Sequence, residues 1–144
     1  MSDQDTRALW DRWISLWNGD LALADDIIHA EFVLHRSPPP QLPEGRTGRD
    51  ALVAWIEQTR SLFPDLHFTV EVGPVVEGGT VAGHWIAEGT YQGGVPGSTA
   101  PAGTRIRFGG TDMWRSEDGR VREYWLSDDL LDLLQQLGVV GGPA

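Results

Sequence analysis

The sequence TRIRFGGTDMWRSEDGRVREYWL, residues 104–126, alternates between apolar and polar side chains on either side of an Asp-Gly pair. Alternation with a period of two is typical of β-strands that bury one face. Asp118-Gly119 is a turn sequence that favours a tight hairpin. We therefore expect two antiparallel strands, residues 104–115 and 120–126, and this pair sets the class of the fold.

Two more strands precede this pair. Residues 66–75 and 80–91 have strand character, and Glu77-Gly78-Gly79 lies between them as a hairpin turn. A loop rich in Gly and Pro, residues 93–103, leads to the strand at 104–115. The second half therefore predicts a four-stranded antiparallel meander.

The first half is mainly helical. Apolar residues at helical spacing predict helices over residues 4–18, 20–29 and 48–63, with a short strand at 31–35 and a Pro-rich loop from 37 to 45. The buried face of the first helix is expected to consist of Leu9, Trp10, Trp13, Leu16 and Trp17.

A last helix follows the meander. Ser127 is its expected N-cap, and Asp128 and Asp129 are placed in its first turn, where carboxylates offset the helix dipole. Helices segregated from a sheet indicate an α+β fold, with a curved antiparallel sheet closed by N-terminal helices into a cone. We expect one domain over residues 1–144, with an ordered core of about 4–138.

Composition excludes several classes of function. The net charge is -10 and argues against nucleic-acid binding and against anionic membranes. The chain contains no cysteine, which fits a reducing cytoplasm, and its N-terminus does not resemble a signal peptide. No metal-ligand spacing, phosphate loop or dinucleotide motif occurs, so we expect neither a metal nor a cofactor.

Asp112 is the most informative polar residue. In the strand 104–115, the period of two places it on the apolar face, between Gly110 and Trp114. Burial raises the pKa of a carboxyl, and such a group can act as a general acid or base near neutral pH. A structural hydrogen bond, or a bulge that turns Asp112 to solvent, is the alternative.

Two further residues are candidates for the same site. His35 ends the first short strand, on the face shared by Glu31 and Val33, and an imidazole there can act as a base near pH 7. Tyr124 is a potential hydrogen-bond donor on the last strand. A structural histidine and ordinary sheet packing are the respective alternatives.

The chain contains seven tryptophans, and rigid aromatic rings can line a pocket for a flat apolar ligand, although most such residues simply fill cores. The residues expected to line the pocket are Trp13, Trp17, Trp55, Trp85, Phe108, Trp114 and Leu126.

An ordered set of short motifs spans residues 8–138. The matching segments are WNGD (17–20), GRTG (45–48), FPDL (63–66), GTY (89–91), PAG (101–103), GTDMWR (110–115), EDGRV (117–121), YW (124–125), Asp129 and LQQLG (134–138). In this order they resemble the SnoaL-like polyketide cyclase family, within the nuclear transport factor 2-like superfamily.

The resemblance implies a cone-shaped α+β fold, a homodimer and cofactor-free ring closure on a polyketide by aldol condensation. In these cyclases a pocket Asp follows the "HW" pair and a pocket His lies on the preceding strand. The matching positions here are Leu126 and Asp112, so the chain departs from the founding cyclases at both. A weaker likeness to ketosteroid isomerase places His35 at the general base and Asp112 at a neutral, hydrogen-bonding Asp.

Together these observations predict a cofactor-independent enzyme that moves protons, in a cyclisation or isomerisation, on an apolar ketone or polyketide-like substrate. Asp112 and His35 would share the transfer, with Tyr124 as donor. A non-catalytic binding or accessory module is the alternative, favoured by Leu126. Epoxide hydrolysis, as in limonene epoxide hydrolase, is a further alternative, but we find no Asp-Arg-Asp set for it.

Overall fold

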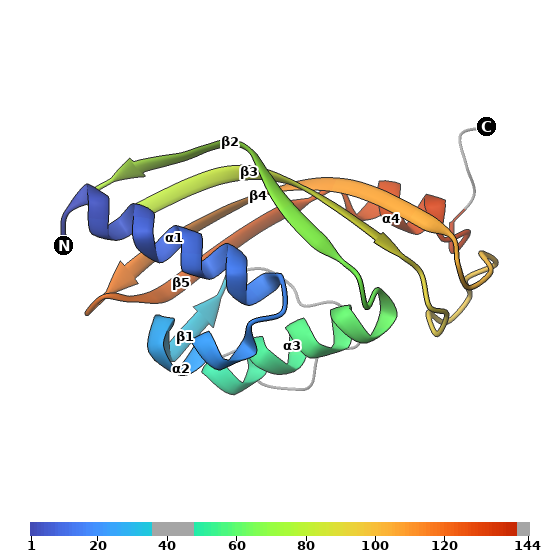
Figure 1. Cartoon of the computed structure of the whole chain (residues 1–144), viewed down its shortest axis with the longest axis horizontal. Coiled ribbons are helices and arrows are strands. Elements are labelled where there is room, and N and C mark those ends of the chain that lie inside the picture. Colours follow the sequence, from blue (N-terminus) through green and yellow to red (C-terminus); the bar gives the residue numbers. More distant parts are fainter. Residues whose placement is uncertain (36–47, 141–144) are drawn as a thin grey trace.

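A five-stranded sheet forms the body of the computed structural model, which describes residues 1–35 and 48–140 (Figure 1). The loop predicted over 37–45 lies outside the described residues. The strands are β1 (Ile28–Leu34), β2 (His67–Glu77), β3 (Thr80–Thr90), β4 (Arg105–Glu117) and β5 (Arg120–Asp128).

The predicted meander of β2, β3, β4 and β5 is confirmed, and its strands are antiparallel neighbours. The sheet order is β1-β5-β4-β3-β2. The prediction of a fully antiparallel sheet is wrong in one respect, because β1 pairs with β5 in parallel. Parallel neighbours need a long crossover connection, and here everything from α3 (Arg49–Leu62) to β4 lies between the two strands. The α+β fold class itself is confirmed, with a mixed sheet.

Helix α1 (Asp3–Trp17) packs on one face of this sheet. A capping box starts it: the Ser2 side chain accepts a hydrogen bond from the Asp5 N–H, and the Asp5 side chain accepts one from the Ser2 N–H. The five residues predicted for its inner face are all buried. The helix approaches β3 closely at Gly83, where a Cβ atom would lie 2.6 Å from the Trp10 ring.

The helix predicted over residues 20–29 is wrong in extent. The chain forms a 3-10 turn η1 (Leu21–Leu23) and one α-turn α2 (Ala24–Ile27), and then enters β1. Ile28 already has extended backbone angles and is fully buried, so the strand begins within the predicted helix. The helix predicted at 48–63 is confirmed as α3.

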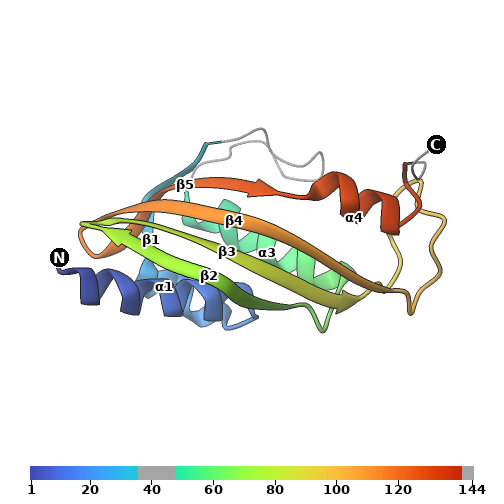
Figure 2. The ribbon, with the colours of Figure 1, turned by 90° about the horizontal axis from the view of Figure 1, so that it is seen from above.

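Helix α4 (Leu130–Gln136) starts later than predicted and lies at the end of β4 and β5, whereas α1 and α3 lie on the inner face of the sheet (Figure 2). Asp129 is its N-cap and accepts a hydrogen bond from the Asp132 N–H. The predicted cap Ser127, together with Asp128, belongs to β5 instead.

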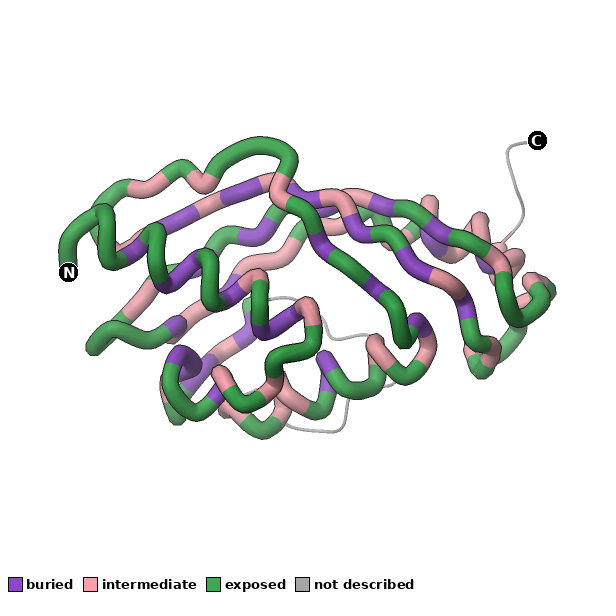
Figure 3. Tube along the Cα trace, in the orientation of Figure 1, coloured by how far each residue is buried: buried purple, intermediate pink, exposed green. Residues whose placement is uncertain are grey.

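Buried residues follow the inner face of the strands and the facing sides of α1 and α3, and the outer face of the sheet is mostly exposed (Figure 3). In residues 1–35 and 48–140, no helix is long and apolar enough to cross a bilayer. The inner face is therefore the place where a buried polar group needs an explanation.

Candidate functional site

Asp112 lies on the inner face, as its position in the sequence predicts. Alternate residues of β4 are buried from Ile106 to Trp114, and Asp112 is one of them, with 3% of its surface exposed. Its cross-strand partners are Gly83 on β3 and Leu126 on β5. The bulge that would turn Asp112 to solvent does not occur, because the β3–β4 pairing is regular throughout.

Two side chains hold the carboxyl of Asp112. The indole N–H of Trp13 donates a hydrogen bond to Oδ2 at 2.9 Å, and the hydroxyl of Tyr124 donates one to Oδ1 at 2.6 Å. The first donor comes from α1 and the second from β5, so the carboxyl joins the helix to two strands. Both donors are themselves buried.

Burial raises the pKa of the Asp112 carboxyl above its usual value of 3.8, because the charged form loses its hydration. The hydrogen bonds from Tyr124 and Trp13 oppose this effect, since they favour the ionised form. The N–H of Trp85 acts in the same direction, and the nearby charge of Asp128 adds to the rise. The balance favours a neutral carboxyl over a wider pH range than for an exposed aspartate.

The aromatic residues predicted to line a pocket surround this carboxyl in a continuous network. Trp13 contacts Tyr124 edge to face at 4.8 Å between ring centroids. Similar contacts join Trp17 to Trp55 at 5.0 Å and Trp85 to Phe108 at 5.6 Å. Trp114 stacks on Trp10 and is fully buried, and Leu126 is half-buried beside them. These residues form the inner-face core, and their contact with a ligand stays a prediction.

His35 does not join Asp112, contrary to the expected pair. Its ring stacks on Trp125 at 4.7 Å, and its Nε2 atom lies 3.1 Å from a carboxylate oxygen of Glu123. The inward residues of β1 are Phe32 and Leu34, so His35 extends the outward set that includes Glu31 and Val33. The structure therefore places His35 on the outer face, with 38% of its side chain exposed.

Sequence reasoning missed Asp128 as an inner-face residue, because it assigned this residue to the last helix. Asp128 is the last residue of β5 and pairs with Gly110 of β4. The signal was available, because the alternation that starts at Tyr124 reaches position 128 if the strand is extended by two residues. Asp128 is half-buried.

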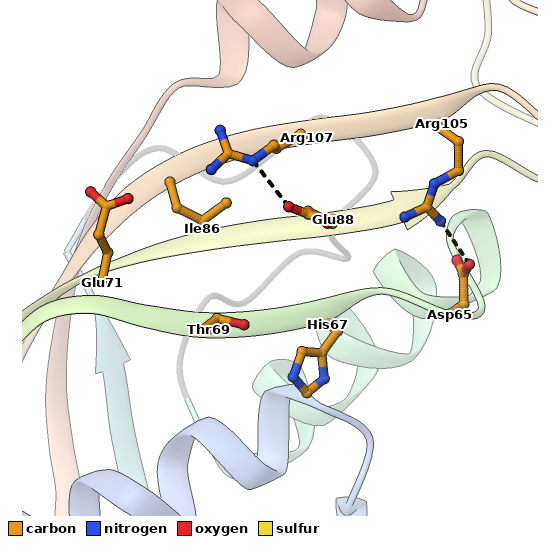
Figure 4. Close-up of a pocket in the computed structure, with 8 residues that line it drawn as sticks. All are labelled: Asp65, His67, Thr69, Glu71, Ile86, Glu88, Arg105 and Arg107. Carbon is orange, nitrogen blue, oxygen red and sulfur yellow. Dashed lines mark hydrogen bonds and ion pairs between the residues drawn. The ribbon is translucent and has the colours of Figure 1, made fainter.

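The outer face carries a concave region that the sequence analysis did not identify (Figure 4). It has a volume of about 410 Å³ and is lined by Asp65, His67, Thr69, Glu71, Ile86, Glu88, Arg105 and Arg107. Its charges are largely paired, since Arg107 bonds Glu88 at 3.0 Å and Arg105 bonds Asp65 at 3.1 Å.

Hydrogen bonds from the backbone N–H and the hydroxyl of Thr90 lower the pKa of Asp65, with a smaller contribution from Arg105. This region is therefore a solvated, internally paired surface, and it lies on the opposite side of the sheet from Asp112. Within the described ranges, no group of three or more His, Asp or Glu side chains is arranged to hold a metal ion.

The fold and sequence match proteins of one family. The family model of the SnoaL-like polyketide cyclases matches residues 7–137. The structure of TsrD from Streptomyces laurentii is 28% identical, with a TM-score of 0.80, and the match covers 97% of this chain and 99% of that chain.

The candidate polyketide cyclase IdmH from Streptomyces antibioticus is 29% identical, with a TM-score of 0.76 and coverage of 96% and 99%. AclR from Streptomyces galilaeus, at 24% identity, a TM-score of 0.82 and coverage of 99% and 87%, shares the fold. A comparison with curated proteins found no match. On the family model and these neighbours, the chain belongs to the SnoaL-like polyketide cyclase family.

Proposed function

We propose that this protein is a cofactor-independent enzyme that transfers protons on an apolar ketone or polyketide-like substrate, in a cyclisation or an isomerisation. The observation that carries the proposal is the Asp112 carboxyl, which is buried among aromatic rings on the inner face and held by two donors. A carboxyl in such a place is expensive to bury, and it is a group that can give and take protons near neutral pH.

Asp112 and Tyr124 form the proposed proton-transfer unit. Their oxygens are 2.6 Å apart, so the hydroxyl of Tyr124 donates to Asp112 over a distance short enough for proton transfer between them. A neutral Asp112 can stabilise a developing oxyanion on the substrate, in the way that a protonated carboxyl does in other apolar sites. His35 has no part in this unit, because its ring lies on the outer face beside Glu123.

One observation favours a second function, a binding or accessory module without chemistry. Both carboxylate oxygens of Asp112 already accept hydrogen bonds from within the protein. Its cross-strand neighbour Leu126 has no proton to transfer. On this view Asp112 is a structural link between α1 and the sheet, and the aromatic surface binds a ligand that leaves unchanged.

Tryptophan fluorescence can separate the two functions. The protein is titrated in D₂O with a panel of polycyclic ketones, anthraquinones, steroids and lactones, and every ligand that quenches the signal is recovered and weighed by mass spectrometry. An enzyme of the proposed type changes the ligand or exchanges its α-protons for deuterium, which raises the mass.

Asp112→Asn should abolish this change, and Asp65→Asn, which alters a carboxyl of the outer face, should retain it. Ligands that bind but return with unchanged mass would support the binding module. Full activity in Asp112→Asn would show that the assignment of the acid is wrong.

A further inference from the structure

The indole N–H of Trp13 restricts where Asp112 can carry a proton. Trp13 lies on the inner side of α1 and is fully buried, and its N–H reaches Oδ2 of Asp112 at 2.9 Å. An indole nitrogen can only donate, so Oδ2 acts as the acceptor of this bond whether the carboxyl is ionised or neutral. The helix thus fixes the role of one of the two carboxyl oxygens.

The other carboxyl oxygen has a partner of a different kind. Oδ1 of Asp112 lies 2.6 Å from the hydroxyl oxygen of Tyr124, which can accept a hydrogen bond as well as donate one. When Asp112 is ionised, Tyr124 donates to it. When Asp112 is neutral and its hydrogen is on Oδ1, the same short distance allows Asp112 to donate to Tyr124.

A hydrogen on Oδ2 would be less well placed. It would share this oxygen with the N–H of Trp13, and the hydroxyl oxygen of a carboxylic acid is a poorer acceptor than its carbonyl oxygen. Both residues are buried, so water does not replace a weakened bond between them. The hydrogen bonds to Trp13 and Tyr124 both keep their strength only when the hydrogen is on Oδ1.

We propose that Trp13 is a positioning residue for Asp112: it holds Oδ2 as the carbonyl oxygen, so that the proton of the neutral carboxyl lies on Oδ1 and is donated to Tyr124. The hydrogen bond between Asp112 and Tyr124 therefore reverses when Asp112 gains or loses its proton, whereas the bond from Trp13 keeps its direction. This inference deepens the proposed function, and its meaning for catalysis rests on that function, because proton transfer needs the proton on a defined oxygen.

Trp13 also influences how readily this proton leaves. Burial raises the pKa of Asp112, and the N–H of Trp13 opposes this effect because it favours the ionised form. The other groups that act on this carboxyl are Tyr124 and Asp128 on β5, which can titrate, and Trp85 on β3, which cannot. Removal of the Trp13 N–H alone should therefore let Asp112 keep its proton to a higher pH.

Infrared difference spectroscopy of the carboxylic C=O stretch tests the position of the proton. Each spectrum is compared with that of the same protein carrying Asp112→Asn, from about pH 3 upward, so that the other carboxyls cancel and the band of neutral Asp112 remains. Trp13→Phe keeps an aromatic ring but removes the N–H. Trp10→Phe is the matched control, because Trp10 is fully buried on the same helix and its N–H has no hydrogen-bond partner among the described residues.

We expect Trp13→Phe to move the Asp112 band to a higher frequency, because a carbonyl that loses a hydrogen bond has a stiffer C=O bond. Trp10→Phe should leave the band in place. The pH at which the band disappears should also rise in Trp13→Phe, whereas loss of a residue that only packs would leave this titration unchanged. An unshifted band in Trp13→Phe, a shift of the same size in Trp10→Phe, or a titration that does not move to higher pH would overturn the inference.

A second measurement needs no tryptophan variant. In a proton–nitrogen correlation spectrum of the wild type, the indole N–H resonance of Trp13 should change with pH together with the infrared band of Asp112. In Asp112→Asn it should stay constant over the same pH range, and the resonance of Trp10 should not follow the titration. A Trp13 resonance that is independent of this titration would overturn the inference even if Trp13→Phe does not fold.

Deuterium exchange into the ligand panel separates this inference from the proposed function. If exchange depends on Asp112 but the infrared band is the same in Trp13→Phe and the wild type, the proposed function stands and the inference fails. If the band shifts as expected but the wild type exchanges no ligand of the panel, Trp13 still positions the proton of Asp112, and the proposed enzyme function fails.

Discussion

Replacement of Asp112 by Asn should change how the free energy of unfolding depends on pH: relative to the wild type, the variant should become more stable as the pH rises. Asparagine has nearly the same shape as aspartate. Its oxygen can accept the hydrogen bond from Trp13, and its amide can donate to the hydroxyl oxygen of Tyr124, which accepts as well as donates. The two contacts can therefore survive, and the variant differs from the wild type mainly by the loss of one ionisable group.

The sign follows from the direction of the pKa shift. Burial raises the pKa of Asp112 above 3.8, so the folded protein holds this proton more tightly than the unfolded chain. The stabilising effect of the proton is complete below pH 3.8 and is lost as the pH rises to the folded-state pKa. Over that interval the wild type loses about 1.4 kcal/mol of unfolding free energy for each pH unit. The unfolding free energy of Asp112→Asn does not fall in this way, because asparagine has no proton to release.

The measurement is urea unfolding of each protein, followed by tryptophan fluorescence from about pH 2 upward. The unfolding free energy of Asp112→Asn minus that of the wild type should rise with pH and then level off. Titrating groups that do not interact with Asp112 cancel in the difference.

Asp65→Asn is the control, because its stability difference from the wild type should change with pH in the opposite direction. Thr90 lowers the pKa of Asp65, so this variant should be less stable than the wild type above pH 3.8, and the gap should close at lower pH. A difference for Asp112→Asn that is flat, or that falls as the pH rises, would refute the argument.

Three more variants test the geometry. Trp13→Phe removes a buried donor to Asp112 and part of a buried ring, and urea unfolding should show a loss of about 2–4 kcal/mol. Gly110→Ala places a Cβ atom 2.5 Å from the Trp85 ring, so thermal unfolding should show a loss of about 1–3 kcal/mol, with a changed near-ultraviolet circular dichroism spectrum. His35→Gln removes the contact with Glu123 and the ring stacking on Trp125, both on the outer face, so stability should change by less than about 1 kcal/mol and any deuterium exchange into a ligand should be unchanged.

The orientation of Asp112 could be predicted from the sequence because β4 is long and regular. Each alternate residue from Ile106 to Trp114 is apolar or small except Asp112, and the pairing with β3 has no bulge that would shift the alternation. Local pattern and tertiary packing agree along this strand, so the period of two gave the correct face.

His35 could not be placed in the same way. Its alternation with Glu31 and Val33 was correct, but a short strand does not itself show which of its two faces is buried. The larger apolar side chains of Phe32 and Leu34 mark the inner face, and they put His35 outside. The parallel pairing of β1 with β5 is a contact between segments far apart in the sequence, and no local sequence pattern predicts it.

Asp128 was missed because the boundary between β5 and α4 depends on tertiary contacts. Residues 127–129 suit a helix start by composition, and Asp129 does cap α4. Pairing of Thr111 with Ser127 and of Gly110 with Asp128 extends the strand by two residues. Asp128 was expected to offset the helix dipole, but because of this extension it lies on the strand with its carboxyl on the inner face.

The stability of the fold does not explain why position 112 carries a carboxyl. An asparagine there can make the hydrogen bonds to Trp13 and Tyr124, and it has no charge to lose hydration above pH 3.8. The property that only aspartate supplies is an exchangeable proton in an apolar, rigid environment. The charge of Asp128, on the same face, adds to the effect of burial and further favours the protonated form of Asp112. A carboxyl that keeps its proton in such surroundings fits the proton transfer proposed above, and that proposal gives Asp112 a reason that packing does not.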